Sequence, residues 1–203
     1  MWFSLFIGML ASYLLGNLNG AVCMSALKHD DVRSHGSGNA GLTNFIRNYG
    51  VGQAAYVILI DAGKAIVSCL LTGLLLEPFG YYRMGTALRG FAVMLGHNFP
   101  ALLGFKGGKG ILSGLFIALT VDWRIALIIL GVFAVAYLLT QYVSLASVLA
   151  ALAFSVSFAV LHFGDWVVMS CGIVMGGMAV YMHRSNIQRL IRGEESKTNL
   201  FKK

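Results

Sequence analysis

Residues 111–182 read ILSGLFIALTVDWRIALIILGVFAVAYLLTQYVSLASVLAALAFSVSFAVLHFGDWVVMSCGIVMGGMAVYM, and this stretch decides the fold. It contains only three charged residues, Asp122, Arg124 and Asp165. A membrane-spanning helix needs about 20 mostly apolar residues, so the stretch is too long for one helix. Polar residues at 122–124, 140–142 and 164–166 divide it into four spans, the first of them short at about eleven residues.

The rest of the chain has the same character. Of its 203 residues 58% are hydrophobic and 11% are charged, whereas soluble domains have about 25% charged residues. Three further apolar runs, 1–27, 51–76 and 86–104, precede the long stretch. We therefore predict an all-α integral membrane protein with about seven transmembrane helices, one span short, in a single polytopic domain over 1–203. A five-span arrangement, in which the later apolar pieces merge, stays open.

The basic residues indicate the orientation. With the N-terminus outside, the polar segments 28–50, 105–110 and 183–203 fall on one face. Eleven of the fifteen Lys and Arg residues lie in them: Lys28, Arg33, Arg47, Lys106, Lys109, Arg184, Arg189, Arg192, Lys197, Lys202 and Lys203. Because basic residues collect in cytoplasmic loops, this face and the C-terminus are predicted to be cytoplasmic. No basic helix with interleaved aromatics is present, so nucleic acid is not an expected partner.

The first polar segment contains SGNAGLTN at 37–44, with Arg47 close behind. Its glycines allow close backbone approach to a ligand, and its hydroxyl and amide side chains are neutral donors. Arg47 adds a planar charged group suited to phosphate. A polar turn between two spans would have the same composition, and this alternative stays open here.

The second polar segment is the end of GHNFPALLGFKGGKG, residues 96–110. The N–H groups of Gly107, Gly108 and Gly110 can form an anion nest, and the helix predicted from Ile111 points its N-terminus at the same place. Lys106 and Lys109 supply positive charge. A nucleotide P-loop needs Ser or Thr after its lysine, so a phosphate cradle without nucleotide fits better. The alternative is a flexible basic loop at the membrane surface.

The third polar segment begins HRSNIQRLIRGEE at 183–195 and reads as a helix end entering the cytoplasm. His183 and Asn186 are three residues apart and share a helical face. His183 could accept a proton from a hydroxyl or donate a hydrogen bond to a phosphate.

These three motifs, in this order, resemble the bacterial membrane glycerol-3-phosphate acyltransferases that use acyl phosphate as donor, and the similarity covers nearly the whole chain. The sequence departs from that family at Leu42, where alanine is more common, and at Ala65, where glycine often follows the Asp61–Lys64 pair. The resemblance implies acyl transfer from acyl phosphate to the 1-hydroxyl of glycerol 3-phosphate, giving lysophosphatidic acid and phosphate. It implies an early step of phospholipid biosynthesis in the bacterial cytoplasmic membrane, with the active site facing the cytoplasm.

The resemblance also implies the site residues. The candidate catalytic residues are His183, Ser37 and Asn186. The candidate substrate-binding residues are Asn39, Thr43, Asn44, Arg47, Lys106, Gly107, Gly108, Lys109, Gly110, Ser144, Ser147 and Glu195. The expected partners are the two small-molecule substrates and membrane lipid, with no cofactor and no metal. Either His183 or a substrate phosphate could be the general base.

Other functions and roles stay open at this stage. Coenzyme-A-dependent glycerolipid acyltransferases generally have Asp five positions after His, and none of the five histidines has it. A phosphate or organic-anion transporter would also need basic glycine segments, but near the bilayer midplane, and a lipid-binding scaffold would not need three polar segments on one face. We expect Asp61 and Lys64 to form a structural ion pair, and His162 and Asp165 to be surface residues. Ser144 and Ser147 could alternatively be helix caps.

Overall fold

The computed structural model describes residues 2–197, and within that range the chain is helical with no strand, as predicted. The α-helices are α1 (Trp2–Gly16), α2 (Gly20–Ala26), α3 (Leu42–Tyr49), α4 (Ala54–Leu76), α5 (Tyr82–Asn98), α6 (Ile111–Val121), α7 (Trp123–Thr140), α8 (Val143–Leu161), α9 (Trp166–Met182) and α10 (Arg184–Ile191). Short 3₁₀ turns are η1 (Val32–Ser34), η2 (Glu77–Phe79) and η3 (Ala101–Leu103). The end of the predicted third segment, with Lys202 and Lys203, lies outside the described residues.

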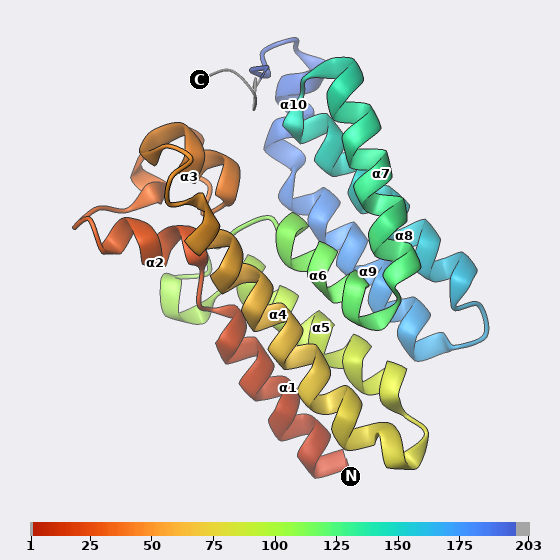
Figure 1. The fold of residues 1–203 in the computed structure, drawn as a ribbon. Coiled ribbons are helices and arrows are strands. Elements are labelled where there is room, and N and C mark those ends of the chain that lie inside the picture. The colour runs from red at the N-terminus through yellow and green to blue at the C-terminus, as the bar shows by residue number, and fades with distance from the viewer. Residues whose placement is uncertain (1, 198–203) are drawn as a thin grey trace. The chain divides into compact units, whose positions relative to one another are not determined.

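The chain divides into two compact units, Met1–Val121 and Asp122–Lys203. In the first unit α5 packs along α1 and α4, and α6 packs against α4 and α5 (Figure 1). In the second unit α8 packs against both α7 and α9, and α10 contacts α8. The prediction of one polytopic domain is not tested by this division.

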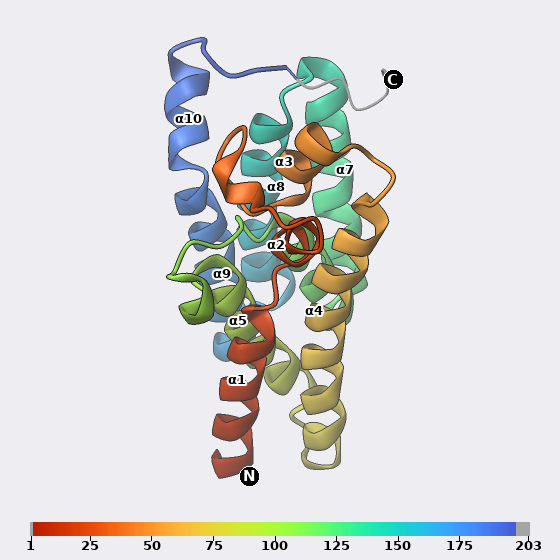
Figure 2. The same ribbon diagram turned by 90° about the vertical axis from the view of Figure 1, so that its left-hand side faces the viewer.

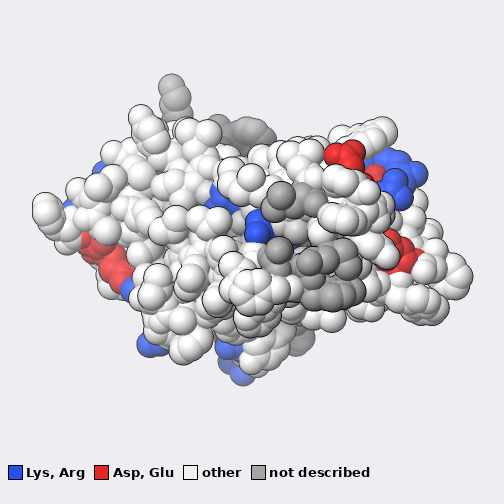
Figure 3. All heavy atoms as spheres, turned by 90° about the horizontal axis from the view of Figure 1, so that it is seen from below, with Lys and Arg blue, Asp and Glu red and all other residues white. Residues whose placement is uncertain are grey.

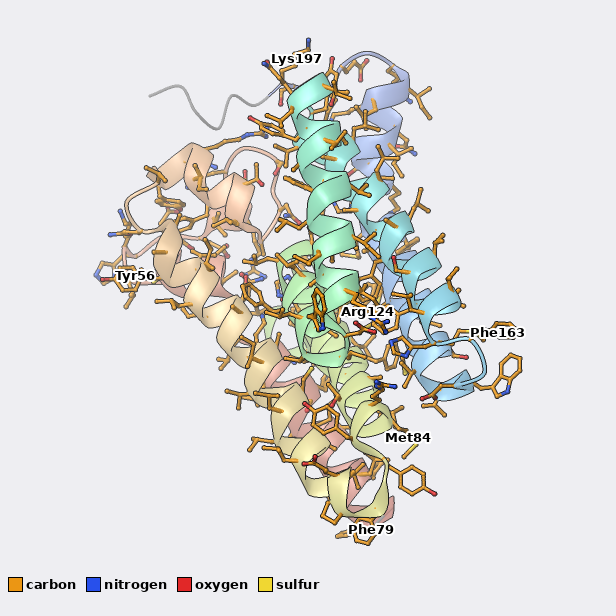
Figure 4. The ribbon with its side chains drawn as sticks, turned by 45° about the vertical axis from the view of Figure 1, so that its right-hand side comes forward. Tyr56, Phe79, Met84, Arg124, Phe163 and Lys197 are labelled. Carbon is orange, nitrogen blue, oxygen red and sulfur yellow. The ribbon has the colours of Figure 1, made fainter. Side chains whose placement is uncertain are left out.

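Within the first unit, the start of α1 and the turn between α4 and α5 lie at one end, as Figures 1 and 2 show. The loop before α3 and the segment after α5 lie toward the other end, where Arg33 Nη1 donates to the Leu103 carbonyl at 3.0 Å. In Figure 4, Tyr56 lies near the start of α4, and Phe79 lies in η2, directly after the end of α4. The predicted segments 28–50 and 105–110 therefore share one end of the first unit.

Within the second unit, Arg124 and Phe163 lie at one end and Lys197 lies at the other (Figure 4). The tail after α9 is thus on the opposite end from the short α6–α7 connection.

The apolar run 1–27 is expected to form one helix, but in the structure α1 and α2 are separate and their axes differ by 46°. Asn17 Nδ2 folds back to the Tyr13 carbonyl at 2.7 Å, and Asn19 caps α2 by accepting from Val22 N–H at 3.1 Å. The N–H of Gly20 donates to Asp61 Oδ1 at 3.2 Å. Short amide side chains that bond nearby backbone compete with the helix, and here they end one helix and start the next.

By length and apolarity, three helices of the described chain could each cross a membrane, namely α4, α7 and α8. The number rises to five if α1 with α2, and α9 with α10, each count as one bent span. The predicted short span corresponds to α6, an apolar helix of 11 residues. The count of seven stays a prediction.

The surface is consistent with a lipid environment. Large apolar side chains such as Phe3, Leu139 and Phe163 are each at least 77% exposed. On the face drawn in Figure 3, uncharged residues cover most of the surface between a few groups of charged side chains. Many exposed large apolar side chains on a surface with few charges are expected where lipid takes the place of water.

Candidate active site

Asn44 holds together the loop that precedes α3. It is 2% exposed, and its Nδ2 donates to the carbonyl oxygens of Val32 at 2.9 Å, His35 at 3.1 Å and Asn39 at 3.1 Å. Its Oδ1 accepts from the backbone N–H of Ser37 at 3.0 Å. A buried amide bonded at both ends to backbone fixes the shape of its loop. The structure thus gives Asn44 a positioning role, and direct substrate binding by it stays a prediction.

The acidic residues of this loop are neutralised within it. Hydrogen bonds from His35, 2.9 Å away, and Tyr49, 2.7 Å away, lower the pKa of the Asp30 carboxyl. Burial, together with the Asp30 carboxylate, raises the pKa of Tyr49 to about 12. Hydrogen bonds from Arg33 lower the pKa of Asp31, and the two form an ion pair of 2.7 Å. Because each carboxylate has a local partner, neither repels an anionic ligand strongly.

The other candidate residues of the loop reach the surface of the first unit. Ser37 and Arg47 are exposed, and Asn39 and Thr43 are partly buried. Ser37 and Asn39 lie between η1 and α3, and Thr43 and Arg47 lie in α3. This is the end of the unit that also carries residues 105–110 (Figure 1). Their substrate contacts remain predictions.

Residues 107–110, here called the glycine segment, pack directly against the end of α5. A Cβ on Gly108 would collide with the His97 ring and come within 2.8 Å of the Ala40 carbonyl oxygen. A Cβ on Gly107 would collide with the His97 carbonyl, and Gly110 has a φ of +80°, which favours glycine. The loop before α3, the glycine segment and the end of α5 are therefore packed closely, and Gly107, Gly108 and Gly110 have no room for a side chain.

The structure corrects one part of the predicted anion nest. The N–H of Gly108 donates to the His97 carbonyl at 3.0 Å, so it is used within the protein. Among the described residues, the N–H groups of Gly107 and Gly110 make no hydrogen bond. Helix α6 begins at Ile111 as predicted, and the N–H groups of its first turn add to those two. Lys106 is exposed beside them.

A buried charged network lies behind the glycine segment. Lys64 Nζ lies 2.8 Å from Asp61 Oδ1, which confirms the predicted ion pair. The same ammonium contacts His97 Nδ1 at 2.8 Å, the Gly16 carbonyl at 3.3 Å and the Leu18 carbonyl. The last two carbonyls come from the break between α1 and α2. The pair thus connects α4, the helix break and the residue against which Gly108 packs.

In the second unit, His183 stands at the bend between α9 and α10. It is 4% exposed, and its Nδ1 lies 2.8 Å from the Ala179 carbonyl. A carbonyl only accepts, so Nδ1 carries the hydrogen and the lone pair of the neutral ring is on Nε2. Asn186 is also buried, and its Nδ2 donates to Glu195 Oε1 at 2.9 Å.

Glu195 joins the tail to two helices. Burial acts to raise the pKa of its carboxyl, but hydrogen bonds from Asn186 and Arg189, together with the nearby Ser144 hydroxyl, outweigh it and lower the pKa. The ion pair with Arg189 measures 2.7 Å. The contacts that Glu195 makes are thus with side chains of the second unit. Its contact with substrate stays a prediction.

Ser144 and Ser147 are buried in the first turns of α8. The N-cap of α8 is Tyr142, and no side chain makes a capping hydrogen bond there. The alternative that these serines are helix caps is therefore wrong.

The opposite end of the second unit holds another polar cluster. Arg124 hydrogen bonds lower the pKa of Asp122, the N-cap of α7, and their ion pair measures 2.6 Å. His162 Nε2 lies 3.4 Å from Asp122 Oδ2 and the residue is 5% exposed. The prediction that His162 is a surface residue is wrong, because it packs beside a carboxylate from another helix. Asp165 is exposed as predicted and caps α9 by accepting from Val168 N–H at 3.2 Å.

Sequence reasoning did not select His97 or Asn98 as site residues. Both are polar residues at the end of an apolar helix, directly before the turn at Pro100, and this position was the available signal. Within residues 2–197, no three His, Cys, Asp or Glu side chains are grouped so that they could hold a metal ion.

Comparison with known proteins gives a consistent result. Residues 6–193 match the family model described as glycerol-3-phosphate acyltransferase. A glycerol-3-phosphate acyltransferase of Prochlorococcus marinus (strain MIT 9215) is 35% identical over 93% of this chain and 95% of its own length. One from Paramagnetospirillum magneticum is 39% identical over 92% of this chain and 90% of its own length.

Two crystal structures of PlsY, an integral membrane glycerol 3-phosphate acyltransferase, are also similar. The glycerol 3-phosphate form has a TM-score of 0.88 and 32% identity, covering 98% of this chain and 100% of that one. The lysophosphatidic acid form has a TM-score of 0.84 and 33% identity, covering 97% of this chain and 96% of that one.

Proposed function

The chain belongs to the glycerol-3-phosphate acyltransferase family, and from this premise we propose that its acyl donor is acyl phosphate and that the acyl group goes to the 1-hydroxyl. Its activity is acyl transfer to glycerol 3-phosphate in phospholipid synthesis, in an integral membrane protein. The proposed products are lysophosphatidic acid and inorganic phosphate. The names of the two PlsY crystal forms, with glycerol 3-phosphate and with lysophosphatidic acid, support this acceptor and this product.

The observation that carries the donor proposal is the glycine segment at the N-terminus of α6. Unpaired N–H groups of Gly107 and Gly110, the first turn of α6 and the flanking Lys106 suit an anion that does not need magnesium. An acyl phosphate is a mixed anhydride with phosphate as its leaving group. The protein then has to position substrates and stabilise charge rather than activate a poor donor.

We assign Lys106, Lys109 and Arg47 to binding of substrate phosphate groups, with Ser37, Asn39 and Thr43 as neutral donors. His183 presents a basic Nε2, since its Nδ1 donates to Ala179. Either this nitrogen or a substrate phosphate takes the proton of the 1-hydroxyl. We favour the phosphate, because the anhydride is already activated and a strong base is not required.

We also propose that the residues at the shared end of the first unit, and the tail of the second unit, face the cytoplasm of a bacterial cell. The excess of Lys and Arg in these segments supports this orientation, and the span count of seven belongs to the same proposal. Glycerol 3-phosphate is soluble and acyl phosphate has an apolar chain, so a membrane–water interface suits both.

The test is release of inorganic phosphate by the purified full-length protein, with palmitoyl phosphate as donor and palmitoyl coenzyme A in a parallel reaction. Phosphate release that depends on glycerol 3-phosphate, with no thiol release from the coenzyme A ester, is the expected result. Acyl transfer from the coenzyme A ester alone would refute the donor proposal. Uptake of phosphate into proteoliposomes without acyl transfer would favour the transporter instead.

A further inference from the structure

Two consecutive polar side chains at the end of α5 face the glycine segment. His97 is 4% exposed and Asn98 is fully buried. A Cβ on Gly108 would collide with His97 Nε2, and a Cβ on Gly110 would lie 2.8 Å from Asn98 Oδ1. Among the described residues, neither His97 Nε2 nor the two amide atoms of Asn98 make a hydrogen bond. Buried polar groups without protein partners at a candidate site are expected to serve a ligand or water.

The Lys64 ammonium determines which His97 nitrogen carries the hydrogen. Nζ lies 2.8 Å from Asp61 Oδ1, and loss of the Lys64 proton would leave that carboxylate as a lone buried charge, which is costly. A charged ammonium has only donors, so His97 Nδ1, 2.8 Å away, has to accept. The neutral ring therefore has its hydrogen on Nε2, the atom that faces Gly108.

This arrangement places a neutral N–H donor beside the N-terminus of α6. Nδ2 of Asn98, which would lie 3.4 Å from a Cβ on Gly110, adds a second neutral donor to the same short segment. Both are held by a rigid helix end rather than by a loop, which favours a fixed geometry for a bound oxygen. Because Asp61 balances the charge of Lys64, this arrangement adds hydrogen-bond donors beside the glycine segment without adding net positive charge.

We propose that the Asp61–Lys64 pair fixes His97 as the Nε2–H tautomer, and that His97 Nε2–H and the Asn98 amide bind a phosphate oxygen of a substrate at the glycine segment. His97 and Asn98 are then binding residues, while Lys64 and Asp61 are positioning residues that act through His97. The ligand class is a phosphate dianion, either a phosphate monoester or an acyl phosphate, and this choice rests on the proposed function.

The direct test is nitrogen NMR of the detergent-solubilised full chain with ¹⁵N-labelled histidine. The His97 signals are assigned by comparison with His97→Gln. We expect a protonated Nε2 and an unprotonated Nδ1 at neutral pH, and a downfield shift of the Nε2–H proton when ligand is added. Glycerol 3-phosphate, inorganic phosphate and a non-hydrolysable acyl phosphonate are added to separate samples, and the ligand that shifts the signal identifies the source of the phosphate.

Two NMR results would overturn the inference: a proton on Nδ1, or a His97 signal that none of the three ligands changes at concentrations well above the KM of the substrates. The second result in an enzyme that still transfers acyl groups would refute this inference and leave the proposed function standing. Absence of acyl transfer from acyl phosphate would refute the proposed donor instead, and the tautomer would still be measured.

Kinetics test the positioning role separately. The double variant Asp61→Asn, Lys64→Met removes both buried charges, so neither is left alone. We expect KM for the phosphate ligand identified by NMR to rise about tenfold to a hundredfold, the equivalent of one charge-assisted hydrogen bond, with a smaller change in kcat. The matched control is Ser68→Ala, a fully buried position one turn further along α4.

His97→Gln keeps an N–H at the position of Nε2, whereas His97→Asn does not. We therefore expect KM to be closer to the wild-type value in the glutamine variant. Equal KM in the two variants, or an unchanged KM in the double variant with the protein folded as judged by thermal unfolding, would contradict the assignment.

Discussion

Substitution of Gly108 by alanine tests why the glycine segment contains glycine. The added Cβ would lie 2.8 Å from the Ala40 carbonyl oxygen, while ordinary contact begins at 3.4 Å, so the backbone has to move by roughly 0.6 Å. It would also collide with the His97 ring. Overpacking of this kind costs about 1–3 kcal/mol. If the ligand requires the original geometry, affinity falls about 5-fold to 140-fold at 1.4 kcal/mol per tenfold change.

The assay is the phosphate-release reaction, with KM for each substrate measured on Gly108→Ala and on a control. Ala101→Gly is the control, because Ala101 is exposed in the η3 turn and the change removes only one methyl group. We expect a raised KM and a lowered melting temperature for Gly108→Ala and small effects for Ala101→Gly. Normal kinetics and normal stability in a Gly108→Ala enzyme present at normal membrane levels would refute both the close packing and the phosphate cradle.

Three other predictions concern the second unit and the topology. His183→Ala should lower kcat if His183 is the base, by the 10²–10⁴-fold typical of general acid–base catalysis; high kcat retained in His183→Gln, which can still donate a hydrogen bond, would instead favour a substrate phosphate as the acceptor. The pKa of Glu195 is lowered in the folded state, so the carboxylate stabilises the fold fully above its usual pKa of 4.5, and this stabilisation is lost as the pH falls through the lowered pKa. Glu195→Gln should therefore have a lower melting temperature than wild type at pH 7. A difference in melting temperature that does not shrink on acidification would contradict this. Single cysteines at positions within 34–48 and 186–200, in a background without the native cysteines, should be labelled from the cytoplasm, and periplasmic labelling of either stretch would overturn the orientation.

The helical elements could be predicted from the sequence because the length of an apolar run and the polar residues that interrupt it are local properties. The boundaries at Ile111 and Val143 and the short helix α6 follow from them. The Asp61–Lys64 ion pair could also be predicted, since its partners are three residues apart on one helix.

The features that were missed depend on contacts between distant parts of the chain. Asn17 and Asn19 lie in an apolar run, and the helix break they produce is stabilised by Asp61 and Lys64 on another helix. His162 is buried because Asp122, forty residues earlier, lies beside it. No periodicity in a single sequence reports such pairs.

The N–H of Gly108 was predicted to face an anion, and this part of the predicted nest is wrong. The sequence pattern suggested a ligand, whereas the structure has the His97 carbonyl as partner of the Gly108 N–H. Which neighbouring group accepts a hydrogen bond from a glycine N–H depends on the path of the surrounding chain. Here that path is fixed by the turn at Pro100 and by contacts with the loop before α3.

The break between α1 and α2 has a consequence for biosynthesis. A lysine near the centre of a membrane helix opposes insertion by about 2.5–3.5 kcal/mol, and Lys64 lies in the middle of α4. Its carbonyl acceptors, at Gly16 and Leu18, are synthesised before it. When α4 leaves the ribosome, the groups that bind its charge are thus already in the membrane, and we expect a rearranged gene that places α1 and α2 after α4 to insert α4 poorly.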